Sequence, residues 1–217
     1  MSTDEWVERA QQLYERAVFG GDCEALATAE RELDAVEADL ALARGRVVHA
    51  RYLERQGEDQ RELELFERAT RLYRSLGDVR GEAEALFWTG AFHQVVRDDN
   101  ETAVPDLERS YELATQAGDK LTMSYALRHL GISDHVAGRL DAARARLEES
   151  VRLRREIGFL PGVAANLVGL IYISAALGRH EEAQALVEEA AAIAEASGAE
   201  TIGRQVEEAR AAVIRPS

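Results

Sequence analysis

The feature that most constrains this chain is a segment that recurs about every 40 residues. Each copy ends in an amphipathic stretch closed by a glycine, and these glycines are Gly77, Gly118, Gly158 and Gly198. The intervals between them are 41, 40 and 40 residues. A fixed period of this length is typical of supersecondary units that stack on one another, and it argues against a single closed core.

Each repeat has the pattern of two helices. Apolar residues recur at helical spacing, as in Leu140, Ala143, Leu147 and Val151, and no stretch keeps the alternation of a strand. Glycines end helices in the left-handed conformation, and a following Asp or Asn can cap the next helix. These signals predict about eleven helices. The predicted helices span residues 4–18, 22–36, 39–56, 59–76, 79–97, 101–117, 120–137, 140–157, 161–177, 180–197 and 199–213.

Composition and charge exclude several classes of function. The chain has 217 residues, 46% of them apolar, and a formal charge of -14. Phosphate neutralisation needs clustered Lys and Arg, so we expect no nucleic-acid partner. No apolar run approaches the ~18 residues of a membrane span, and the N-terminus lacks the order of a signal peptide. We therefore expect a cytoplasmic protein without membrane contact, whose acidic groove could attract a basic peptide.

Residues 124–150 resemble a tetratricopeptide repeat. That motif needs an apolar residue, Leu-Gly, Gly, a small residue, an apolar residue and a second small one. The matching residues are Leu127, Leu130, Gly131, Gly138, Ala143, Leu147 and Ser150. Residues 83–110 and 164–190 match with departures, since Thr89 replaces Leu and Ile171 replaces the first Gly. Residues 39–76 match weakly because Arg46 and His49 occupy apolar positions, and residues 4–36 keep only the rhythm of a hairpin.

The resemblance implies an all-α fold, a right-handed superhelix of about five helical hairpins with a C-terminal capping helix. The period near 40 is similar to the longer bacterial variant of the family, which often accompanies signalling and transcription regulators. One domain over 1–217 is expected. It comprises degenerate hairpins at 4–36 and 39–76, clearer repeats at 79–118, 120–158 and 161–198, and a capping helix at 199–213.

Members of this family usually bind along the concave surface, which the first helix of each hairpin lines. Arg128 would offer a planar fork of donors to a carboxylate or phosphate, and Tyr125 and Tyr172 would offer flat faces with polar tips. The alternative is that the aromatic rings pack between helices and Arg128 pairs with Glu84 or another acid. By resemblance, the predicted groove residues are Glu84, Phe87, Ala91, Gln94, Tyr125, Arg128, Ile132, His135, Ala165, Val168, Tyr172 and Ala175.

The sequence contains no recognisable catalytic or metal-binding motif. His129 and His135 are six residues apart, which places them on different faces of one helix, and no HExxH or paired CxxC occurs. A phosphate-binding loop and a Gly-x-Ser-x-Gly elbow are also absent. The family's clamp for chaperone tails needs several Lys, Arg and Asn, and Arg128 alone does not supply it. We predict no cofactor, no metal and no catalytic residue.

The leading hypothesis is a non-catalytic scaffold or adaptor that binds a protein or peptide segment in its concave groove. A regulatory sensor that binds a small molecule or signal peptide in the same groove is the alternative. An enzyme or a biosynthetic helper built on the superhelix is a third, weaker hypothesis. A homodimer is also consistent with the pattern, because superhelix ends and apolar convex patches often associate.

Overall fold

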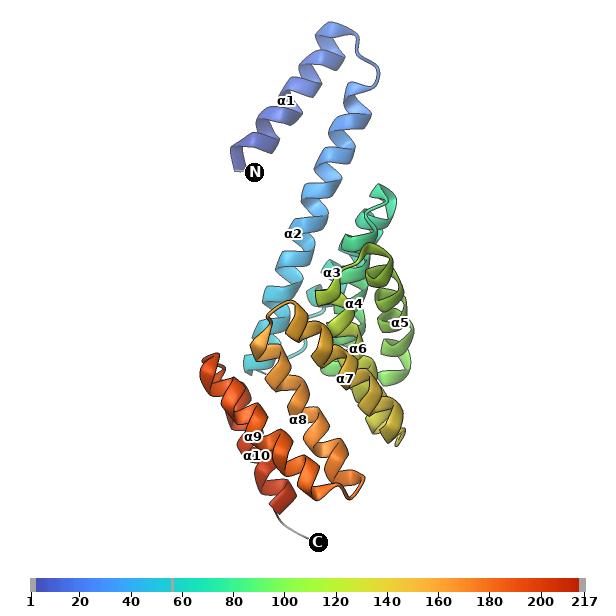
Figure 1. Cartoon of the computed structure of the whole chain (residues 1–217). Helices are drawn as coiled ribbons and strands as arrows, with labels where there is room; N and C mark the ends of the chain where they lie inside the picture. The colour runs from blue at the N-terminus through green and yellow to red at the C-terminus, as the bar shows by residue number, and fades with distance from the viewer. Residues whose placement is uncertain (1–2, 56, 215–217) are drawn as a thin grey trace.

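The computed structural model describes residues 3–55 and 57–214, which form ten α-helices and no strand. Successive helices pack against one another as sequential antiparallel hairpins (Figure 1), so the predicted all-α fold is confirmed. The helices are α1 Thr3–Gly20, α2 Ala25–Arg55, α3 Arg61–Leu76, α4 Val79–Val96, α5 Asn100–Ala117, α6 Lys120–Val136, α7 Leu140–Glu156, α8 Leu160–Ala176, α9 His180–Ala196 and α10 Glu200–Ile214.

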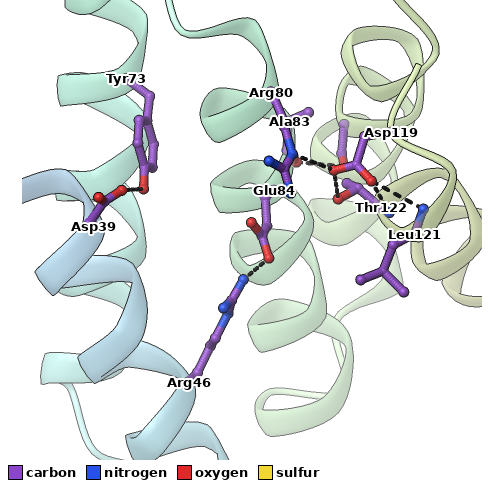
Figure 2. Close-up of polar contacts among 10 residues, drawn as sticks. Asp39, Arg46, Tyr73, Arg80, Ala83, Glu84, Asp119, Leu121 and Thr122 are labelled. Atoms are coloured by element: carbon purple, nitrogen blue, oxygen red, sulfur yellow. Dashed lines mark hydrogen bonds and ion pairs between the residues drawn. The ribbon is translucent and has the colours of Figure 1, made fainter. Parts of the chain in front are cut away.

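The first two hairpins differ from the prediction because α2 is one continuous helix of 31 residues. Two helices, 22–36 and 39–56, were predicted there. The intervening residues contain no Gly or Pro, and nothing in them stops a helix. The carboxylate of Asp39 accepts a hydrogen bond from the Tyr73 hydroxyl at 2.8 Å (Figure 2) and does not cap a helix. The first half of α2 therefore pairs with α1, and the second half pairs with α3.

The even-numbered helices form the inner row of the stack. Helices α2, α4, α6, α8 and α10 each contact the next member of this series, whereas no odd-numbered helix contacts the next odd one among the described residues. The odd-numbered helices therefore form the outer row. This arrangement places the first helix of each hairpin on the inside, where the family resemblance predicted the groove.

Turn chemistry fixes where the helices end. Gly77 ends α3 in the left-handed conformation with φ 73°, and Gly118 ends α5 with φ 68°. Each is followed by an aspartate that caps the next helix, as when Asp119 accepts hydrogen bonds from the backbone N–H groups of Leu121 and Thr122. The glycines that mark the period are thus the joints between hairpins.

Ion pairs one repeat apart join the inner helices. Arg46 of α2 pairs with Glu84 of α4 (Figure 2). Arg80 of α4 pairs with Asp119, which precedes α6, at 3.3 Å between Nε and Oδ2. Glu84 is therefore not available to Arg128. Burial, followed by the bond to Asp39, raises the pKa of Tyr73 in the same region.

Helix α10 closes the end of the stack. Val206 and Ala209 are fully buried, and Ile202 packs against the same core cluster. The side chain of Val213, which follows Ala209 by four residues, lies outside the described residues. Within the described part of the chain, no helix combines the length and the apolar character needed to cross a bilayer.

Candidate binding site on the inner wall

A cavity of about 300 Å³ opens on the inner row of helices. Its walls come from α2, α4, α6, α8 and α10, together with Arg154 of α7 and the turn before α8. Leu53 near the end of α2 and Ile202 near the start of α10 both line it, although the two residues are far apart in sequence. The curvature of the stack therefore brings its first and last inner helices to one site.

Aromatic rings form much of the cavity wall. The rings of Phe87 and Tyr125 are stacked with centroids 5.1 Å apart, and Phe159 meets Tyr125 edge-on at 6.0 Å. Trp88 meets Phe87 edge-on at 5.0 Å. These ring contacts link α4 to α6, and they link α6 to the turn before α8. Interlocked rings hold the wall in a fixed shape, which lowers the entropy cost of binding.

Two arginines carry the positive charge of the site. Arg128 donates from Nη1 to the Ala165 carbonyl at 2.7 Å and to Asn166 Oδ1 at 3.1 Å. Arg154 donates to the Gly162 carbonyl at 2.6 Å and to the same Asn166 oxygen at 2.9 Å. Its guanidinium carbon lies 5.1 Å from the centre of the Tyr125 ring. Neutral acceptors therefore hold both side chains in place.

No carboxylate among the described residues pairs with either arginine. Arg154 is 1% exposed, and its Nη2 has no hydrogen-bond partner in that part of the chain. Burial, followed by the charge of Arg128, lowers the pKa of Arg154 to about 9, and burial lowers the pKa of Arg128 as well. Desolvating a cation without a counter-ion is costly, so the arrangement favours an anion at the cavity.

His129 lies beside these arginines in its neutral form. Its Nδ1 is 2.6 Å from Gln94 Oε1, which can only accept, so Nδ1 carries the proton. The Gln94 amide nitrogen lies 3.0 Å from the His129 carbonyl oxygen and 2.8 Å from Ser133 Oγ. Burial, followed by the charges of Arg128 and Arg154, lowers the pKa of His129 to about 3.

Protonation of His129 should make stability depend on pH. The unfolded chain takes up this proton near pH 6.5 and the folded chain only near pH 3, so acid favours unfolding between these values. The full contribution to the free energy of unfolding is present above pH 6.5, and at pH 4.5 we expect about 3 kcal/mol of it to be lost. Denaturant unfolding at both pH values, compared with a His129→Asn variant that keeps the donor to Gln94, isolates this effect. Equal pH dependence in the two proteins would contradict the assignment.

The structure brings together only some of the predicted groove residues. Phe87, Ala91, Tyr125, Arg128 and Ala165 line the cavity. Gln94 and Val168 are buried in helix packing, Glu84 pairs with Arg46, and none of the three lines it. Ile132, His135, Tyr172 and Ala175 do not line the cavity either, although Tyr172 is 38% exposed and follows Ala165 by seven residues on the same face of α8.

Other residues of the site were not predicted. Arg154 belongs to an outer helix, and its sequence neighbours Arg152 and Arg155 are surface residues. The glycine at position 162 was a usable signal in the sequence, because no larger residue fits there. A Cβ on Gly162 would lie 2.4 Å from the Phe159 ring and 3.0 Å from Arg154 Cδ. A glycine in the first turn of α8 thus marks a close approach. His49 and Leu53 were not predicted because residues 39–76 match the repeat weakly, and no groove positions were assigned to that hairpin.

Comparison with known proteins gives a fold and not a family. No family model matches the chain, and no curated protein matches it in sequence. It is similar to the crystal structure of aspartyl phosphate phosphatase F from Bacillus subtilis, with a TM-score of 0.71 and 13% identity. The match covers 97% of this chain and 54% of that one, so the chain spans about half its length. The stacked helical hairpins, a fold like that of tetratricopeptide repeats, are thereby confirmed, and the activity is not transferred.

Proposed function

We propose that the chain is a non-catalytic binding module that holds a segment of another protein, or a short peptide, on its inner wall. The ligand places a carboxylate beside Arg128 and Arg154 and an apolar or aromatic side chain among Phe87, Tyr125 and Phe159. The observation that carries this proposal is the pair of desolvated arginines without a counter-ion in a preformed aromatic cavity.

The size of the cavity supports recognition of one or two residues of the ligand. A volume of about 300 Å³ is at the lower end of ligand pockets. The rest of a peptide would extend along the inner faces of α6 and α8 toward Tyr172, about 10 Å beyond Ala165 at the helical rise of 1.5 Å per residue.

The charge of the cavity is opposite to that of the chain. The net charge of -14 led us to expect a basic ligand, yet the titratable groups that line the cavity are arginines, histidines and a tyrosine. Overall acidity affects long-range encounter, whereas contacts within the cavity decide which group is bound there. We therefore propose a ligand with an acidic group at this position.

Selection from a random peptide library tests the proposal. Peptides retained by the wild type should be enriched in a carboxylate next to a large apolar residue, and Arg128→Gln should lose that enrichment because one donor remains in place of a charged fork. Arg109→Gln is the matched control, since it removes the same charge from the outer helix α5, where Arg109 pairs with Glu112. The same enriched peptides on wild type and Arg128→Gln would contradict the proposal.

The second candidate is a sensor for a small organic acid. It is favoured by the convergence of residues from five inner helices on one small cavity. A thermal-shift screen of free carboxylic acids separates the two functions. A saturable rise in melting temperature with one compound, absent in Arg128→Gln, would support the sensor, and only the peptide-binding function predicts enrichment of extended sequences.

A further inference from the structure

Helix α2 carries an apolar stripe that the other described residues leave about half exposed. Leu26, Leu33, Leu40 and Val47 recur every seven residues, and between 37% (Leu33) and 53% (Val47) of each residue's surface is exposed. Residues at this spacing lie on one face of a helix, and a sustained seven-residue repeat is the pattern of a seam between two helices. From Leu26 to Val47 the stripe is about 32 Å long at 1.5 Å per residue.

Helix α1 extends the same apolar face. Val7, Tyr14 and Val18 are each about half exposed, at 49%, 50% and 52%. They lie roughly 100–140° around α1 from the buried Leu13, and the α2 stripe is turned in the same rotational sense from its own contact with α1. In an antiparallel pair these angles put both stripes on one side of the hairpin. Tyr14 thus contributes to the exposed face of the hairpin and does not anchor it.

The α1–α2 hairpin has few contacts with the rest of the chain. Figure 1 shows α1 and the first half of α2 projecting away from the repeat stack, and α1 packs on no described helix other than α2. Two helices alone leave an apolar face in water, which more commonly marks an interface than a free surface.

Charges beside the stripe change sign along α2. Glu30 and Glu37 follow Leu26 and Leu33 by four residues, whereas Arg44 and Arg51 follow Leu40 and Val47 by four. All four therefore border the same edge of the stripe. Arg44 and Arg51 form no ion pair with any described carboxylate.

The basic end of this face opens into a hollow between α2 and α3. Its volume is about 760 Å³, and five arginines line it with only one glutamate. The hollow is lined by Arg44, Arg51, Arg61, Arg68 and Arg71, and Val47 continues the apolar stripe into it. Arg61, Arg68 and Arg71 pair with Asp59, Glu37 and Glu67 of the same chain, which leaves Arg44 and Arg51 to face a partner. Residues 3–39, which form the projecting hairpin, contain eleven acidic and three basic residues. One face of the chain therefore carries both an acidic apolar arm and a basic apolar hollow.

We propose that a second copy of this chain covers this face. The two α2 helices pack antiparallel about a twofold axis near the middle of the stripe, and the acidic α1–α2 hairpin of each protomer lies against the arginine-lined hollow of its partner. A twofold interface requires a self-complementary patch, and opposite charges at the two ends of one stripe provide it. A parallel pair would place like charges together and is disfavoured.

Sedimentation measures the association directly. The wild type should sediment as a dimer at micromolar concentration, and Leu33→Glu with Leu40→Glu should be monomeric with unchanged helix content, because both side chains are exposed. Val136→Glu is the control, since Val136 is 70% exposed on α6. A wild type that stays monomeric at about 100 μM, or a dimer that survives the double substitution, would overturn the proposal.

Charge reversal tests the pairing of acidic and basic ends. One variant carries Arg44→Glu, and the other carries Glu30→Arg, because the proposed twofold axis places Glu30 of each protomer opposite Arg44 of its partner. Each alone should dimerise at least tenfold more weakly than the wild type, and an equal mixture should form heterodimers of nearly wild-type affinity. If mixing restores nothing, the charges do not face one another and the proposal fails.

Crosslinking decides the direction of the helices. In a background with the exposed Cys23 replaced by serine, an oxidised mixture of Leu26→Cys and Val47→Cys chains should give disulfide-linked dimers. Leu26→Cys alone should give almost none, because antiparallel helices place its two copies far apart. Efficient crosslinking of Leu26→Cys alone would show a parallel dimer and overturn the antiparallel arrangement.

Discussion

Replacing Leu147 with alanine should lower the free energy of unfolding by about 3 kcal/mol, with a range of 2–5. Leu147 is 2% exposed and lies between two glycines of different hairpins. A Cβ added to Gly131 of α6 would lie 3.2 Å from the Leu147 side chain, and a Cβ added to Gly169 of α8 would lie 2.8 Å from that side chain. The substitution leaves a void between α6, α7 and α8, where closely approaching helices cannot collapse further.

The midpoint of chemical unfolding, followed by circular dichroism, measures this loss. Leu160→Ala is the matched control, because Leu160 is 44% exposed and the same deletion should cost less than about 1 kcal/mol. Similar losses for both variants would mean that the contact between the second and third clear repeats does not depend on the packing of Leu147 against Gly131 and Gly169.

Replacing Arg154 with methionine should separate binding from stability. We expect the affinity for peptides selected by the wild type to fall at least 100-fold, about 2.7 kcal/mol, because the ligand's carboxylate loses its most desolvated partner. We expect the free energy of unfolding to change by less than about 1 kcal/mol. The lost hydrogen bonds to Gly162 and Asn166 are offset because a cation no longer has to be desolvated, and methionine keeps most of the apolar stem.

Titration calorimetry and denaturant unfolding on the same preparation provide both values. A loss of stability of 3–5 kcal/mol with unchanged affinity would show that Arg154 supports the fold and does not bind the ligand. Arg152→Met is the control, since Arg152 is exposed on the same helix and, among the residues that the structure describes, pairs only with Glu149 and Glu156.

The sequence was informative where the chain obeys local rules. Gly77 and Gly118 end α3 and α5 because glycine takes the left-handed conformation without steric cost, and the aspartate after each one caps the next helix. Close contacts such as Gly131 with Leu147 also followed from the spacing of small and large residues. Helical hairpins could therefore be predicted from single repeats.

Predictions failed where the outcome depended on distant residues. The continuous α2 was missed because the weak repeat there suggested a break, whereas Gly45 packs on Phe66 of α3 and Asp39 bonds to Tyr73. Arg154 resembled the other arginines of the outer helices, and only the turn at Phe159 and Gly162 directs it inward. Net charge was a poor guide to the cavity for the same reason, since it does not reveal which charges the fold brings together.

The central claim is that Arg128 and Arg154 recognise a carboxylate in the inner-wall cavity. The most direct measurement compares the most enriched peptide with its analogue in which that carboxylate is a carboxamide, on the wild type and on Arg128→Gln. We predict at least a tenfold weaker affinity of the amide for the wild type and less than a twofold difference for Arg128→Gln, a coupling of about 1 kcal/mol or more. Equal affinities of the acid and the amide for the wild type would contradict the claim.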